Sequence, residues 1–242
     1  MQSQILNRMV VNSLMKVRSK SSLIKLSNYL CAISLIVCAM VALPLTVHAQ
    51  ALTESSTNMA NKPTILVFGD SLSASYGIAQ SQGWVSLLTQ RLNKQRYNYN
   101  VVNLSISGET TSGGLSRFNQ AITQVKPSIV ILELGANDGL RGLSVTDTYK
   151  NLDAMIALAK PAEVLLLGMK IPPNYGLRYS AEFSDNYSKL AEKHAIKFVP
   201  FMLEGVAGKR ELILDDGLHP NVSAQLTILE NCWIQLKTML KK

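Results

Sequence analysis

Cysteine and histidine are scarce in this chain of 242 residues, which has three of each. Two cysteines, Cys31 and Cys38, lie in the first 49 residues, so the rest of the chain has only Cys232 and cannot form an internal disulfide. Beyond residue 49 the only histidines are His194 and His219, which are too few for a His-rich zinc cluster. Carboxylates alone could still bind a metal, but no motif in the sequence indicates such a site. We therefore expect no metal and no cofactor.

Acidic residues are absent from residues 1–49, which carry five basic ones. An apolar run follows from Tyr29 to Val47, and the small residue Ala49 comes two positions later. A basic segment, an apolar segment and small residues at the end are typical of an export signal. We therefore expect residues 1–49 to be a signal peptide that is cleaved after Ala49, and the protein to be periplasmic or secreted.

Two alternatives to cleavage remain open for this segment. The apolar run is about long enough to cross a bilayer, which takes roughly 20 residues, so an uncleaved signal could act as a membrane anchor. Lipid attachment at Cys38 is disfavoured because the bulky Val37 precedes it. The five basic residues also account for most of the formal net charge of +8 and leave +3 for the rest of the chain, so we expect no nucleic-acid partner.

After a Thr-, Ser- and Asn-rich stretch that predicts a disordered linker over residues 50–62, short apolar runs alternate with helical patterns over residues 63–242. The predicted strands are Thr64–Phe68, Asn100–Leu104, Ile129–Leu134, Val164–Met169 and Lys197–Phe201. The predicted helices are Trp84–Leu92, Leu115–Val125, Leu152–Ala159, Phe183–Ala191 and Ala224–Leu240. This alternation predicts an α/β domain with a five-stranded parallel sheet covered on both faces.

Polar clusters follow the predicted strands where parallel sheets bind ligands, beyond the strands' carboxyl ends. They read GDSL from Gly69, SISGET from Ser105, GANDG from Gly135 and, before the last helix, DDGLHP from Asp215. Together they offer a Ser hydroxyl, a His with a nearby Asp, and amide donors. Acyl transfer needs these groups as nucleophile, base, orienting acid and oxyanion donors.

In these motifs the chain resembles the SGNH or GDSL hydrolases, and within them the exported bacterial thioesterase I, arylesterase and lysophospholipase group. The resemblance implies a flavodoxin-like, three-layer α/β/α sandwich and a serine esterase or thioesterase. It carries over Ser71 as nucleophile, His219 as base and Asp216 as its partner. It also places the oxyanion hole at the Ser71 N–H, Gly108 and Asn137.

The substrate pocket is less well specified by the sequence. We expect Leu140, Ile171 and Asn174 to contact substrate, although the segment around Asn174 also fits a loop stiffened by prolines. Asp70 is also expected among the substrate-binding residues, with two alternatives: it orients the Ser71 loop, or it caps the following helix. Tyr76 departs from near relatives and is expected to affect only the pocket rim.

The expected substrates are small acyl esters and thioesters, including aryl esters, acyl-CoA and lysophospholipids, and we expect a monomer. One alternative keeps the same triad but removes O-acetyl groups from carbohydrate, although an aromatic content of 6% argues mildly against a sugar-binding surface. Another is a flavodoxin-like binding module whose site has decayed. The intact Ser71, Gly108, Asn137 and His219 disfavour that reading.

Overall fold

The computed structural model describes residues 62–242. The predicted signal peptide, its cleavage site and all of the predicted linker except Lys62 lie outside the described residues. Among residues 62–242, none of the helices combines the length and the hydropathy that a membrane crossing requires.

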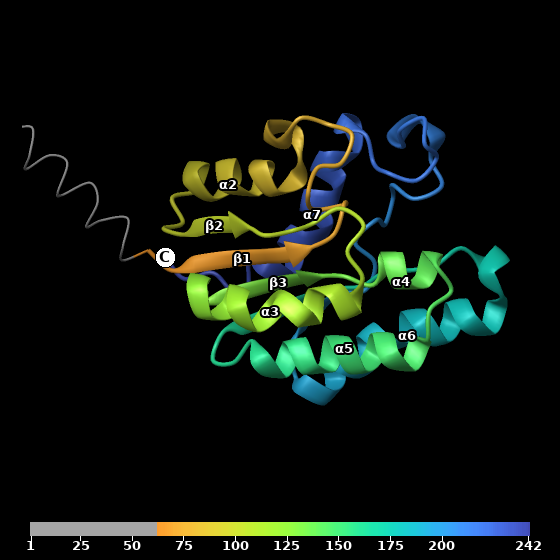
Figure 1. The fold of residues 1–242 in the computed structure, drawn as a ribbon. Helices are drawn as coiled ribbons and strands as arrows, with labels where there is room; N and C mark the ends of the chain where they lie inside the picture. The colour runs from red at the N-terminus through yellow and green to blue at the C-terminus, as the bar shows by residue number, and fades with distance from the viewer. Residues whose placement is uncertain (1–61) are drawn as a thin grey trace, which may run out of the picture. The chain divides into compact units, whose positions relative to one another are not determined.

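The described residues form a single parallel sheet, as the sequence predicts (Figure 1). Its strand order is β2-β1-β3-β4-β5, and every neighbouring pair is parallel. The strands are β1 (Thr64–Gly69), β2 (Asn100–Asn103), β3 (Ile129–Glu133), β4 (Glu163–Leu167) and β5 (Lys197–Val199). Every residue of β3 is buried, as is expected of a strand that is covered on both faces.

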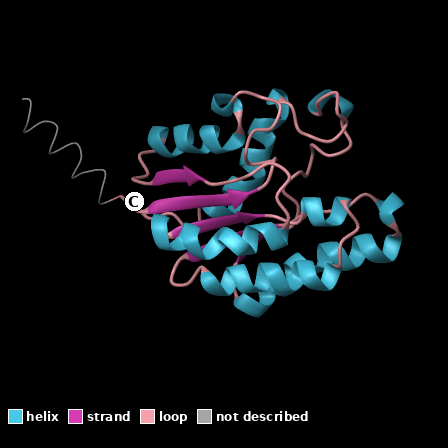
Figure 2. Ribbon diagram, in the orientation of Figure 1, coloured by secondary structure: helices cyan, strands magenta, loops and turns pink. Residues whose placement is uncertain are grey.

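Two layers of helices cover this sheet, which confirms the three-layer α/β/α architecture (Figures 1 and 2). One face carries α2 (Trp84–Lys94) and α7 (Gln225–Leu236), which pack against each other. The other carries α3 (Thr111–Val125), α5 (Val145–Leu158) and α6 (Leu177–His194). In α6 the buried residues Phe183, Tyr187 and Leu190 recur at spacings of three and four, and this pattern puts one apolar face on the sheet.

Several helix bounds differ from the sequence expectations, with polar capping as one cause: α5 begins seven residues before the expected Leu152, after a Ser144 cap, whereas α6 begins six residues before the expected Phe183 without a side-chain cap. Helix α3 begins at Thr111, four residues before the expected Leu115, because the Thr110 side chain accepts a hydrogen bond from the Gly113 N–H. A short helix, α4 (Ala136–Leu140), follows β3 and was not expected, since five residues are too few to show a period. It carries Asn137 into the site.

Candidate active site

The loops at the carboxyl edge of the sheet bring Ser71, Gly108, Asn137 and His219 to one cavity. Ser71 comes directly after β1, Gly108 lies in the loop after β2, and Asn137 lies in α4 after β3. His219 arrives from the far end of the chain, on the loop that precedes α7. The residues singled out in the four sequence motifs therefore meet at one edge of the sheet, as parallel topology requires.

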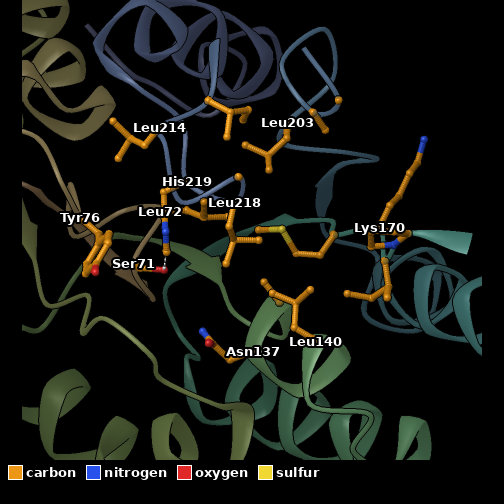
Figure 3. A pocket seen from close by; sticks show the side chains of 18 of the residues that line it. Ser71, Leu72, Tyr76, Asn137, Leu140, Lys170, Leu203, Leu214, Leu218 and His219 are labelled. Carbon is orange, nitrogen blue, oxygen red and sulfur yellow. Dashed lines mark hydrogen bonds between the residues drawn. The ribbon is translucent and has the colours of Figure 1, made fainter. Parts of the chain in front are cut away.

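A continuous hydrogen-bonded relay links Ser71, His219 and Asp216, and Figure 3 shows the contact between Ser71 and His219. The Ser71 Oγ lies 2.9 Å from the His219 Nε2. On the other side of the ring, Nδ1 lies 2.7 Å from the Asp216 Oδ2. Because Nδ1–H donates to this carboxylate, Nε2 is left as an acceptor for the serine proton.

The loop that holds the base fixes Asp216 by backbone contacts. The Asp216 Oδ1 accepts from the Leu218 and His219 N–H groups, both at 2.9 Å, so Oδ2 is free for the imidazole. These two backbone hydrogen bonds, with a smaller contribution from the imidazole, lower the pKa of Asp216 to about 2. Gly217, which lies between Asp216 and Leu218 in the chain, has a φ of 73°, a left-handed conformation that glycine adopts without strain. The neighbouring Asp215 is exposed and lines the cavity.

The Asn137 amide turns toward the cavity beneath Ser71 (Figure 3). Its Nδ2 donates to the Asp70 Oδ2 at 3.0 Å, and a primary amide has a second N–H to offer. Gly108 lines the same cavity, and its carbonyl accepts from the Arg141 guanidinium at 3.0 Å. This arrangement can present hydrogen-bond donors to the carbonyl oxygen of an acyl group that is attached to the Ser71 Oγ.

Asp70 and Glu133 lie behind these groups, both 0% exposed. The Asp70 Oδ1 accepts from the Leu72 N–H at 3.0 Å, so this carboxylate holds the start of the Ser71 loop. Burial raises the pKa of Asp70 to about 6, and burial together with the Asp70 charge raises the pKa of Glu133 well above its usual value. Asp70 does not line the cavity, so its side chain contacts the site from behind.

The cavity has a volume of about 1050 Å³ and lies at the upper end of the range for small-molecule sites. Leu140 and Ile171 line it, whereas Asn174 is exposed and does not. Tyr76 stands at the rim, with its ring centroid 4.3 Å from that of His219. Sequence reasoning missed further lining residues on the segments after β4 and β5, among them Met169, Lys170, Phe201, Leu203, Arg210 and Leu214.

Those six residues follow strand ends, so the same rule that located the motifs could have found their segments. Their individual side chains carry no motif, and which of them face inward depends on loop conformation. Within residues 62–242, no group of three or more His, Cys, Asp or Glu side chains could hold a metal ion.

Comparison with known proteins places this geometry among lipases and esterases. The GDSL-like Lipase/Acylhydrolase family matches residues 67–225. Esterase TesA of Pseudomonas aeruginosa is 48% identical over 186 residues, covering 76% of this chain and 92% of that protein. Thioesterase 1/protease 1/lysophospholipase L1 of Escherichia coli is 40% identical over 179 residues, covering 73% and 85%.

Solved structures agree with these sequence matches. A crystal structure of TesA has a TM-score of 0.72 at 48% identity and covers 73% of this chain and 99% of that one. A structure of the psychrotrophic esterase EstA from Pseudoalteromonas sp., described as inhibited by monoethylphosphonate, has a TM-score of 0.69 at 39% identity and covers 73% and 97%.

Proposed function

Because this chain belongs to the GDSL-like lipase/acylhydrolase family and is a hydrolase of ester or thioester bonds, we propose that it works through a Ser71-His219-Asp216 triad. The relay from the Ser71 Oγ through His219 to Asp216, with distances of 2.9 and 2.7 Å, is the observation that carries this proposal. The oxyanion hole consists of the backbone N–H groups of Ser71 and Gly108 and the side chain of Asn137.

In this reaction the His219 Nε2 accepts the hydroxyl proton as the Ser71 Oγ attacks the carbonyl carbon. Asp216 accepts from Nδ1–H and stabilises the imidazolium that forms. The carbonyl oxygen becomes an oxyanion and accepts hydrogen bonds from the three donors. The bond to the alcohol or thiol then breaks, the leaving group takes the proton from His219, and water hydrolyses the acyl-enzyme by the same steps.

The apolar lining of the cavity supports acyl groups as the part of the substrate that is buried. Leu140, Ile171 and Leu203 are among its lining residues, and Lys170 and Arg210 add two cationic groups. We propose a broad range of aryl esters, acyl thioesters and lysophospholipids. Removal of O-acetyl groups from carbohydrate gains no support from this largely aliphatic lining. We also propose export through residues 1–49, with the protein acting as a monomer in the periplasm or outside the cell.

The test is hydrolysis of p-nitrophenyl esters and acyl-CoA substrates of varied chain length by Ser71→Ala and His219→Ala. We expect each to lose nearly all turnover and to keep the thermal unfolding temperature, since triad members act as a unit. The matched controls Ser188→Ala and His194→Ala, at residues of α6, should keep normal turnover. A phosphonate inhibitor should label Ser71 in the unchanged protein. Substantial turnover by Ser71→Ala would end the serine-hydrolase proposal.

A further inference from the structure

We propose that Asp70 and Glu133 are positioning residues for the oxyanion hole, in which ionised Asp70 aims the Asn137 amide and neutral Glu133 holds Asp70 in place. This inference rests on the proposed function, because it assumes that Asn137 donates to the oxyanion. Neither side chain has any exposed surface, so both act on the reaction through their neighbours.

The contacts of Asp70 determine which way the Asn137 amide faces. An ionised carboxylate only accepts hydrogen bonds, so it attracts the amide nitrogen and repels the amide oxygen. The 3.0 Å contact from the Asn137 Nδ2 to the Asp70 Oδ2 therefore excludes the flipped amide. One amide N–H is held by Asp70, and the planar group then fixes the direction of the second. That second N–H is the one left for the oxyanion.

Glu133 ties the Asp70 segment to the end of β3. The Glu133 Oε2 accepts from the Ser73 hydroxyl at 2.7 Å and from the Asp70 backbone N–H at 3.2 Å. A Cβ at Gly69 would lie 2.7 Å from the Glu133 backbone oxygen and would also clash with this carboxyl oxygen, so only glycine lets the two strands approach here. The nucleophile loop is thus held on both sides of Ser71 by one buried side chain.

Electrostatics indicates which member of the pair carries the charge. Two buried carboxyl groups in contact do not both ionise at neutral pH. The contacts favour ionised Asp70, whose carboxylate accepts from the Leu72 N–H and from the Asn137 Nδ2. Burial and the Asp70 charge raise the pKa of Glu133 well above its usual value, which favours protonated Glu133. Among the other titratable groups that interact with the pair, His219 favours ionised Asp70. Burial and the nearby carboxyl groups raise the pKa values of Tyr187 and Cys232, so both groups stay neutral.

The first experiment is the variant Asp70→Asn, alone and combined with Asn137→Ala. An amide at position 70 presents N–H groups toward Asn137, which turns its oxygen to face them and loses its oxyanion donor. We expect kcat to fall by about 10²-fold, the effect of losing such a donor, with KM changed by less than about 3-fold. Asn137→Ala should show a similar loss, and the double variant should be no slower than Asn137→Ala alone. Additive losses, or a normal kcat in Asp70→Asn, would overturn the role of Asp70.

The second experiment is Glu133→Gln, which mimics a permanently neutral acid. Its amide oxygen can still accept from Ser73 and from the Asp70 N–H, so we expect kcat to stay within about 3-fold of normal. A loss of about 10²-fold in a variant that unfolds at the normal temperature would show that Glu133 must be ionised, and would overturn this part of the proposal. The Ser71→Ala variant distinguishes a failure of the proposed triad from a failure of the proposed positioning residues. If it is inactive while Asp70→Asn is normal, the triad stands and only the positioning pair fails.

Discussion

At the scale of single residues, the two adjacent aspartates before His219 have different surroundings. Asp216 contacts the imidazole and two backbone N–H groups, whereas Asp215 is exposed at the cavity wall. In Asp216→Asn the new amide nitrogen can face Nδ1, which favours the tautomer whose Nε2 carries a proton and cannot accept one from Ser71. We expect kcat to fall by about 10²–10⁴-fold in Asp216→Asn and by less than about 3-fold in Asp215→Asn.

The measurement is kcat/KM against pH for both variants with one p-nitrophenyl ester. Because its lowered pKa keeps Asp216 ionised at every pH above about 4, protonation of this carboxylate adds no acid limb to the wild-type profile. If Asp215→Asn proves to be the slow variant, the assignment of the orienting acid is reversed.

The buried Asp70 should also make stability depend on pH. Its folded-state pKa of about 6 exceeds the ordinary value of 3.8 because burial disfavours the charged form. The protonated form is therefore favoured by folding, and its stabilising contribution is present below about pH 4 and lost as pH rises through 6. Relative to Asp70→Asn, wild type should lose on the order of 1–3 kcal/mol of unfolding free energy between pH 4 and 7. Urea unfolding of both proteins at the two pH values measures this, and parallel pH dependences would contradict it.

At the scale of elements, Asp138 joins α4 to the N-terminus of α3 and to α5. Its buried carboxylate accepts from the Thr111 N–H at 2.8 Å and from the Thr111 and Thr148 hydroxyl groups. A negative charge at the start of a helix is favourable, and removing it leaves buried donors without acceptors. We expect Asp138→Ala to lower the unfolding free energy by about 3 kcal/mol.

The matched control for this helix junction is Asp147→Ala, which removes an exposed carboxylate from the first turn of α5. We expect that control to change the unfolding free energy by less than about 0.5 kcal/mol. Urea unfolding at neutral pH compares the two variants. Equal losses in both would show that the Asp138 network adds no stability of its own.

The strands and the site motifs were predictable for a common reason. Runs such as Ile129–Leu132 are apolar at successive positions, which strands covered on both faces require, and the motifs directly follow such runs. The start of α3 and the whole of α4 were not predictable from periodicity, because a side-chain cap at Thr110 and a five-residue turn decide them. In the sequence, Glu133 is only a residue near the end of a predicted apolar strand. Its contacts with Ser73 and Asp70 in the structure reveal its place behind the site.

At the scale of the whole molecule, the proposed export signal, residues 1–49, precedes the described domain. If residues 1–49 direct export, the protein recovered outside the bacterial cytoplasm should begin at Gln50. N-terminal sequencing of that protein is the measurement, with Ala49→Lys as a variant that should block cleavage and leave the chain at its full length. A recovered chain that retains residues 1–49 in wild type would favour the uncleaved anchor.

The wide separation of Ser71 and His219 along the chain has a consequence for biosynthesis. The nucleophile lies just after β1, and the base lies on the loop before α7. The strands β2 to β5 lie between these two residues along the chain. A ribosome therefore delivers the serine early and its base among the last segments to emerge. Until His219 has been made, the nascent chain holds the Ser71 hydroxyl without its base. In the proposed mechanism hydrolysis therefore requires that the segment with His219 has been made and has folded beside Ser71, so an unfinished chain leaves acyl esters intact.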